Sequence, residues 1–193
     1  MDRRTLLLTG SSFLLQALVS PSMALSGPKT YYVSGKGRDS NNGTTPETPF
    51  RTLQKAANLT TPGATVLVMK GVYANPWPDS SVLEINRSGN ALAYITYRNF
   101  PGHHPKILVA AHNWQGIAIR ASYIIVRGFE VAGNALNLTY EEAWRERFTD
   151  SPKTNAFGIA IAKWPNYETL RNVAVRNNYV HHMPAAGIAT IAT

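Results

Sequence analysis

The sequence predicts an all-β fold, a parallel β-helix or solenoid with a short capping helix near its N-terminus. Internal repeats give the main signal. The tripeptide Gly-Ile-Ala opens three strand-like segments, Gly116–Ile119, Gly158–Ile161 and Gly187–Thr190. Residues 123–131 also align with residues 172–180, and the two copies share β-branched residues at equivalent positions. Repeats of this kind are the sequence signature of solenoid folds.

Each repeat reads as one coil of strands separated by turns. The apolar positions that match between the copies are Ile124 with Val173, Val126 with Val175, and Val131 with Val180. Gly128 aligns with Asn177, and these are residue types that readily adopt a positive φ. We therefore expect a sharp bend at Gly128 and Asn177 between two strands of each coil.

The first 24 residues predict a signal peptide. Arg3 and Arg4 precede an apolar stretch that is too short to span a bilayer comfortably, and Ser22–Ala24 offers a cleavage site of small residues. The arginine pair is typical of a twin-arginine export signal. Asp2 stands where such signals usually have Ser or Thr, so an ordinary secretory signal is the alternative. Both predict a mature protein that begins near Leu25 and is secreted or periplasmic.

Residues 25–64 are expected to form an N-terminal cap. Asp39–Gly43 has the spacing D-x-N-x-G, for which an Asx-type turn is favoured over a calcium loop. Thr52 is a candidate N-cap for a helix over residues 53–59, which places Leu53, Ala56 and Ala57 on one face. Such a helix would cover the open end of a solenoid, where backbone groups and core are otherwise exposed.

Residues 65–193 are expected to form the coils. The predicted strands before the repeats cover residues 65–69, 93–98 and 106–109. Residues 135–156 interrupt the repeat with a short helix that begins at Thr139, and residues 162–171 form a second long loop. Insertions in solenoids collect on one face, which is often the binding face.

The last Gly-Ile-Ala segment completes no coil. From the sequence we therefore expect a β-helix that is open at its C-terminal end and part of a longer gene product. An uncovered strand edge invites pairing with another chain. Self-association through this open coil is accordingly expected.

Composition restricts the chemistry. The chain has no cysteine, which excludes disulfides and thiolate metal sites. Its formal net charge is +8, which favours an anionic partner. The basic residues are scattered and form no run of five or more, which also fits a solvated basic surface. We expect neither nucleic acid nor, once the signal is removed, a membrane as partner.

Several segments together resemble a known family. These are Tyr31–Ser34, Asp39–Thr44, Pro49–Ala56, Pro62–Val66 and Gly71–Tyr73. They are similar to the N-terminal capping region of bacterial right-handed parallel β-helix proteins, above all the secreted polysaccharide lyases of the family-nine pectate lyase type. The resemblance covers nearly all of residues 30–193 and implies a right-handed β-helix.

The resemblance also implies a chemistry. In those lyases calcium neutralises a uronate carboxylate, and a lysine or arginine abstracts the C5 proton before β-elimination. This chain is therefore expected to be an exported, lyase-like protein for acidic, uronate-containing glycans, with calcium as implied cofactor. No stretch matches the calcium cluster, so no catalytic or metal residue is assigned, and residues 25–193 alone are expected to release no unsaturated uronide. The alternatives are a non-catalytic glycan-binding or surface protein and an inactive truncated product.

Two basic residues are candidates for substrate binding. Arg120 and Lys163 each lie at the end of a Gly-Ile-Ala strand. Since side chains alternate along a strand, Ala118 and Ala160 are expected to point outward when the isoleucines point into the core. This would give a floor of small residues with basic residues at its edge. Solvated charges at the coil edge are the alternative.

Aromatic residues in the loops complete the candidates. Trp144 and Trp164 are predicted to contact sugar rings, since an exposed indole stacks well on them, and Trp114 flanks the same strands. Packing within the loops is the alternative. The pairs His103–His104 and His181–His182 fall in predicted turns and are interpreted as surface residues, because adjacent histidines alone do not make a metal site.

Overall fold

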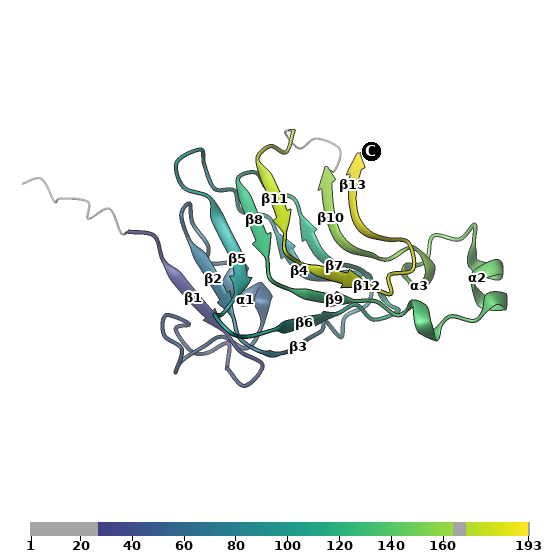
Figure 1. Ribbon diagram of the computed structural model, residues 1–193, viewed down its shortest axis with the longest axis horizontal. Coiled ribbons are helices and arrows are strands. Elements are labelled where there is room, and N and C mark those ends of the chain that lie inside the picture. The colour runs from purple at the N-terminus through teal and green to yellow at the C-terminus, as the bar shows by residue number, and fades with distance from the viewer. Residues whose placement is uncertain (1–26, 164–168, 193) are drawn as a thin grey trace, which may run out of the picture.

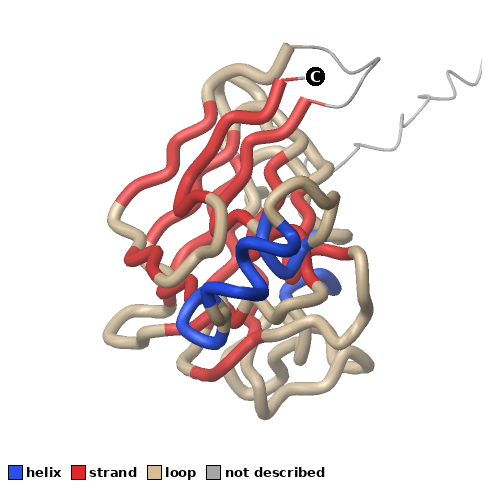
Figure 2. Tube along the Cα trace, turned by 90° about the vertical axis from the view of Figure 1, so that its right-hand side faces the viewer, coloured by secondary structure: helices blue, strands red, loops and turns tan. Residues whose placement is uncertain are grey.

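The computed structural model describes residues 27–163 and 169–192, which wind into a parallel β-helix (Figure 1). Three parallel sheets run along the solenoid: sheet A (β1, β2, β5, β8, β11), sheet B (β3, β6, β9, β12) and sheet C (β4, β7, β10, β13). Each coil adds one strand to every sheet, in the order A, B, C. Figure 2 shows these strands stacked behind the helices of an excursion that faces the viewer.

The described residues form four such coils. The strands are β1 (Thr30–Val33), β2 (Thr65–Val68), β3 (Gly71–Tyr73), β4 (Ser80–Ile85), β5 (Ile95–Asn99), β6 (Pro105–Leu108), β7 (Asn113–Ile119), β8 (Ile124–Arg127), β9 (Glu130–Ala132), β10 (Phe157–Lys163), β11 (Val173–Arg176), β12 (Tyr179–His181) and β13 (Ala186–Ala192). The signal-peptide prediction lies outside the described residues.

The repeats stack in the register that the alignment predicts. Ile159 of β10 pairs with Ile117 of β7 on one side and with Ile188 of β13 on the other. Val173 and Val175 of β11 likewise lie against Ile124 and Val126 of β8. Identical residues therefore form columns along the solenoid, and Leu83, Ile117 and Ile159 of one column are fully buried. The buried apolar core is therefore a direct consequence of the sequence repeat.

The bend between sheets A and B also confirms the prediction. Gly128 has φ = 77° and Asn177 has φ = 55°, and the amide of Gly128 donates to the carbonyl of Asn177 at 3.0 Å. The side chain of Asn178 stabilises the equivalent bend of the preceding coil. Its Oδ1 accepts from the amide of Phe129 at 3.0 Å, and its Nδ2 donates to the carbonyl of Val126 at 3.1 Å.

Helix α1 (Leu53–Ala57) closes the N-terminal end of the core. Thr52 caps it as predicted, and Leu53, Ala56 and Ala57 are buried, although the helix ends before Leu59. Next to this face, the amide side chain of Gln54 lies along the free edge of β4. It accepts from the Glu84 amide at 2.9 Å and donates to the Glu84 carbonyl at 3.1 Å. The Gln54 side chain thereby makes the two hydrogen bonds to β4 that the backbone of a neighbouring strand would otherwise make.

The predicted excursion leaves the coil between β9 and β10. A short 3₁₀ turn (Ala135–Asn137) leads to α2 (Tyr140–Glu146) and α3 (Pro152–Asn155), and α2 projects away from the sheets (Figure 1). The expected capping box is present at Thr139 and Glu142. Glu142 also binds Lys153 at 2.6 Å, and the hydrogen bonds from Lys153 and from Thr139 lower the pKa of Glu142 to about 2.

Candidate functional site

Arg120 lies just beyond β7, on the outer side of sheet C. Its guanidinium Nη2 is 3.4 Å from Oε1 of Glu84 on the neighbouring strand β4, and about a quarter of its side chain is exposed. The Arg120 amide also bonds to the carbonyl of Ile85 at 2.9 Å. The ion pair holds a partly exposed guanidinium at the edge of sheet C, a geometry suited to recognising a carboxylate.

The structure describes only some of the residues that are predicted to lie near Arg120. Lys163 is the last residue of β10 and pairs through its backbone with Ala192, whereas Trp164 lies outside the described residues. Ala118 and Ala160 stack beside Glu84, outside the core cluster, but both are fully buried. The expected open floor of small residues is therefore wrong, because other groups cover these alanines.

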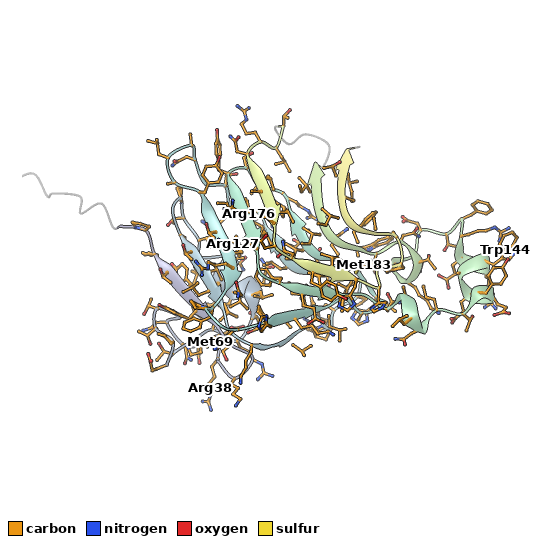
Figure 3. All side chains as sticks on the ribbon, in the orientation of Figure 1. Arg38, Met69, Arg127, Trp144, Arg176 and Met183 are labelled. Atoms are coloured by element: carbon orange, nitrogen blue, oxygen red, sulfur yellow. The ribbon has the colours of Figure 1, made fainter. Side chains whose placement is uncertain are left out.

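Trp144 is far from these residues, at the tip of α2 (Figure 3). Its side chain is partly exposed, but two groups already lie against the ring. The Tyr140 ring stacks at a centroid distance of 6.3 Å, and the Arg147 guanidinium lies 3.8 Å above the indole. A sugar that stacks on Trp144 would compete with these contacts. Trp114 belongs to β7 rather than to a loop.

A cluster that sequence analysis missed lies on the outer face of sheet B. Glu130 of β9 uses Oε1 to bind Lys106 Nζ at 2.8 Å and His181 Nε2 at 3.2 Å, so three consecutive coils share one carboxylate oxygen. Tyr179 stacks on His181 at a centroid distance of 4.5 Å. The interpretation of His181 as a turn residue is wrong, because it ends strand β12. The sequence repeat could have predicted this cluster, because Glu130 aligns with Tyr179 and His181 follows Tyr179 two positions later.

A hollow of about 460 Å³ lies beside this cluster, at the bend between sheets A and B. Its lining includes Glu130, Tyr179 and His104, together with Asn99 and Asn177. Carboxylate, amide, imidazole and phenol groups thus share one depression with Gly128 and Phe129. Such a lining can hydrogen-bond the hydroxyl groups of a small polar ligand.

Acid is expected to weaken the Glu130 cluster selectively. The hydrogen bond from Lys106, reinforced by His181, lowers the pKa of Glu130 below its ordinary 4.5 despite partial desolvation. The stabilisation is therefore fully present above about pH 4.5 and is lost as the pH falls through the folded-state pKa. Urea unfolding should show wild type more stable than Glu130→Gln at about pH 6, with the gap closing towards about pH 3. The exposed Glu47→Gln variant is the control, and a gap that stays constant with pH would contradict the assignment.

The calcium-like motif of the cap is used for another purpose. Asp39 Oδ1 accepts from the amides of Arg51 and Thr52, both at 2.9 Å, and Oδ2 accepts from the Thr52 hydroxyl at 2.7 Å. These bonds fix the entry to α1 instead of closing a local turn at Asp39, and the local Asx-type bond runs from the Thr44 amide to Asn42 Oδ1 at 3.1 Å. Within the described residues, no three His, Asp or Glu side chains gather closely enough to hold a metal ion. Over the same residues, no helix has the length and apolar character needed to cross a membrane.

Comparisons with solved structures find the same fold in two enzymes. The GH136 lacto-N-biosidase from Eubacterium ramulus superposes with a TM-score of 0.65 at 21% identity, over 84% of this chain and 30% of that one. A rhamnogalacturonan lyase superposes with a TM-score of 0.54 at 22% identity, over 78% of this chain and 36% of that one. The fold is thus related to a polysaccharide lyase and to a glycoside hydrolase.

Sequence comparisons agree with the structural ones. The uncharacterized protein YwoF of Bacillus subtilis (strain 168) is 39% identical over 69 residues, which are 36% of this chain and 13% of that protein. The chain therefore spans only a small part of these relatives. The model of the Pel9A-like, right-handed β-helix region matches residues 31–192. This match covers most of the chain and confirms the handedness and the resemblance, so the protein belongs to the Pel9A-like right-handed β-helix family.

Proposed function

We propose that this chain belongs to an exported, polysaccharide lyase-like protein that acts on acidic, uronate-containing glycans by β-elimination. The single observation that carries the proposal is Arg120, held by Glu84 at the outer edge of sheet C. A guanidinium recognises a carboxylate through paired hydrogen bonds, and a uronate offers one carboxylate per sugar. The formal net charge of +8 supports an anionic substrate.

The relatives support the same direction. One structural neighbour is named a rhamnogalacturonan lyase. The resemblance to lyases extends the proposal to calcium, for which the described residues offer no cluster. The rival function is glycan binding without catalysis. The appearance of unsaturated uronide, followed by its ultraviolet absorbance, separates the two in assays of the whole gene product.

Replacing Arg120 tests the binding surface. Arg120→Ala is expected to weaken binding to polygalacturonate by about tenfold, since a charge-assisted hydrogen bond contributes about 1.5–3 kcal/mol. Binding is measured by affinity electrophoresis, with neutral galactan as the comparison polymer. Arg145→Ala on α2 is the control with the same charge change. Equal effects of the two substitutions would argue against a glycan site at sheet C.

A further inference from the structure

Sheet A carries a ladder of arginines on its outer face. Arg98 of β5 pairs in register with Arg127 of β8, and Arg127 pairs with Arg176 of β11. Their neighbours on each strand, Tyr97, Val126 and Val175, belong to or pack against the core, so the arginines point outward. Figure 3 shows Arg127 and Arg176 on adjacent strands. The three residues are therefore stacked along the solenoid axis, with their backbones about 4.8 Å apart per coil.

Nothing within the described residues neutralises this ladder. The ion pairs of that part of the chain involve Lys106, Arg120, Lys153 and His181, and none involves the three ladder arginines. The one side-chain hydrogen bond of the ladder runs from Arg98 Nε to the carbonyl of Asn99 at 3.4 Å. The strands of sheet A also contain no acidic residue.

Such an arrangement has an energetic consequence. Like charges placed directly opposite each other on neighbouring strands destabilise a sheet. Glutamate or threonine at one rung would remove the repulsion, and on sheet B the in-register column runs through Lys106, Glu130 and Tyr179, so that a glutamate faces the lysine. The ladder thus places like charges opposite each other on sheet A, which lowers stability, whereas sheet B pairs a lysine with a glutamate. This difference indicates a role in binding.

We propose that the Arg98–Arg127–Arg176 ladder binds an acidic polysaccharide that runs parallel to the solenoid axis, on a face distinct from sheet C. A polyuronate carries one carboxylate per sugar, and guanidinium groups bind carboxylates well, so a chain lying along the ladder can offer several carboxylates to the three arginines. This inference rests on the proposed function only for the class of glycan. The ladder would hold the polymer while another face acts on it.

The experiment compares two triple variants with the same change in net charge. In the ladder variant, Arg98, Arg127 and Arg176 become glutamine. In the control, the exposed Arg38, Arg51 and Arg145 become glutamine. Calorimetry with polygalacturonate should show at least hundredfold weaker binding for the ladder variant and less than about threefold for the control. Equal losses in the two variants would overturn the proposal, as would tighter binding of a single-stranded oligonucleotide than of polygalacturonate.

Thermal unfolding without glycan gives a second, independent readout. Because the ladder repels itself, Arg127→Gln should leave the melting temperature unchanged or raise it, while weakening polygalacturonate binding about tenfold. A lower melting temperature with unchanged binding would show that the ladder is structural and would overturn the proposal. Arg120→Ala is measured alongside. Binding that depends on Arg127 but not on Arg120 would reject the sheet C site and retain the ladder, and the reverse would reject the ladder.

Discussion

Replacing Gly158 with alanine is expected to lower the free energy of unfolding by about 3 kcal/mol. Gly158 is in β10 and lies close to Val180 of β12 in sheet B. An added Cβ would lie 2.4 Å from Cγ1 of Val180 and 2.5 Å from the carbonyl oxygen of Gly187. One of these neighbours is backbone of the next strand, so the strain cannot be relieved by a side-chain rotation alone.

Urea unfolding measures this loss, with Gly35→Ala as the matched control. Gly35 is exposed, and nothing lies within 4 Å of a Cβ added there. That variant should stay within about 0.5 kcal/mol of wild type. Shortening the neighbour in Gly158→Ala/Val180→Ala should recover only part of the loss, because the Gly187 carbonyl stays in place. A Gly158→Ala protein as stable as the Gly35→Ala protein would show that the strands can separate freely here.

The repeat in the sequence predicted the strand register because stacking in a solenoid aligns identical positions. The columns through Ile117 and Val126, and the positive φ of Gly128 and Asn177, follow directly from the aligned copies. Tyr123 aligns with Asn172, and the two residues adopt φ = 59° and φ = 58°. Asparagine readily adopts a positive φ, whereas a bulky aromatic residue rarely does. The backbone of Tyr123 therefore follows the repeat of the coil and not the preference of its own side chain.

The site residues were harder to predict because they depend on what covers or joins the outer faces. Strand alternation predicts an outward-facing Ala118, but it says nothing about the groups that bury this residue completely. The sequence does not identify His181 as a strand residue, because a three-residue strand has little pattern of its own. Arg127 and Arg176 already align in the sequence, yet Arg98 joins them only through strand pairing. Contacts across coils therefore decide the chemistry of this surface.

Replacing Gln54 with methionine is expected to lower the free energy of unfolding by about 2–3 kcal/mol. Methionine keeps the length and helix propensity of the side chain but removes both hydrogen bonds to the Glu84 backbone. It also removes the bond from Gln54 to the Asn58 side chain, at 2.8 Å. The amide and carbonyl of Glu84 would then be left unpaired at the free edge of β4.

The same substitution should make the N-terminal edge of sheet C available to other chains. An unpaired strand edge is a template for intermolecular pairing, and the Gln54 side chain blocks it at its centre. Sedimentation velocity should therefore show more self-association for Gln54→Met than for Lys55→Met, a control on the next position of α1. Gln54→Glu should fall between them in stability, because a carboxylate can still accept from the Glu84 amide but cannot donate to its carbonyl. If Gln54→Met and Lys55→Met unfold at the same urea concentration, α1 closes the core through Leu53 and Ala56 alone, and the side-chain bridge to β4 is dispensable.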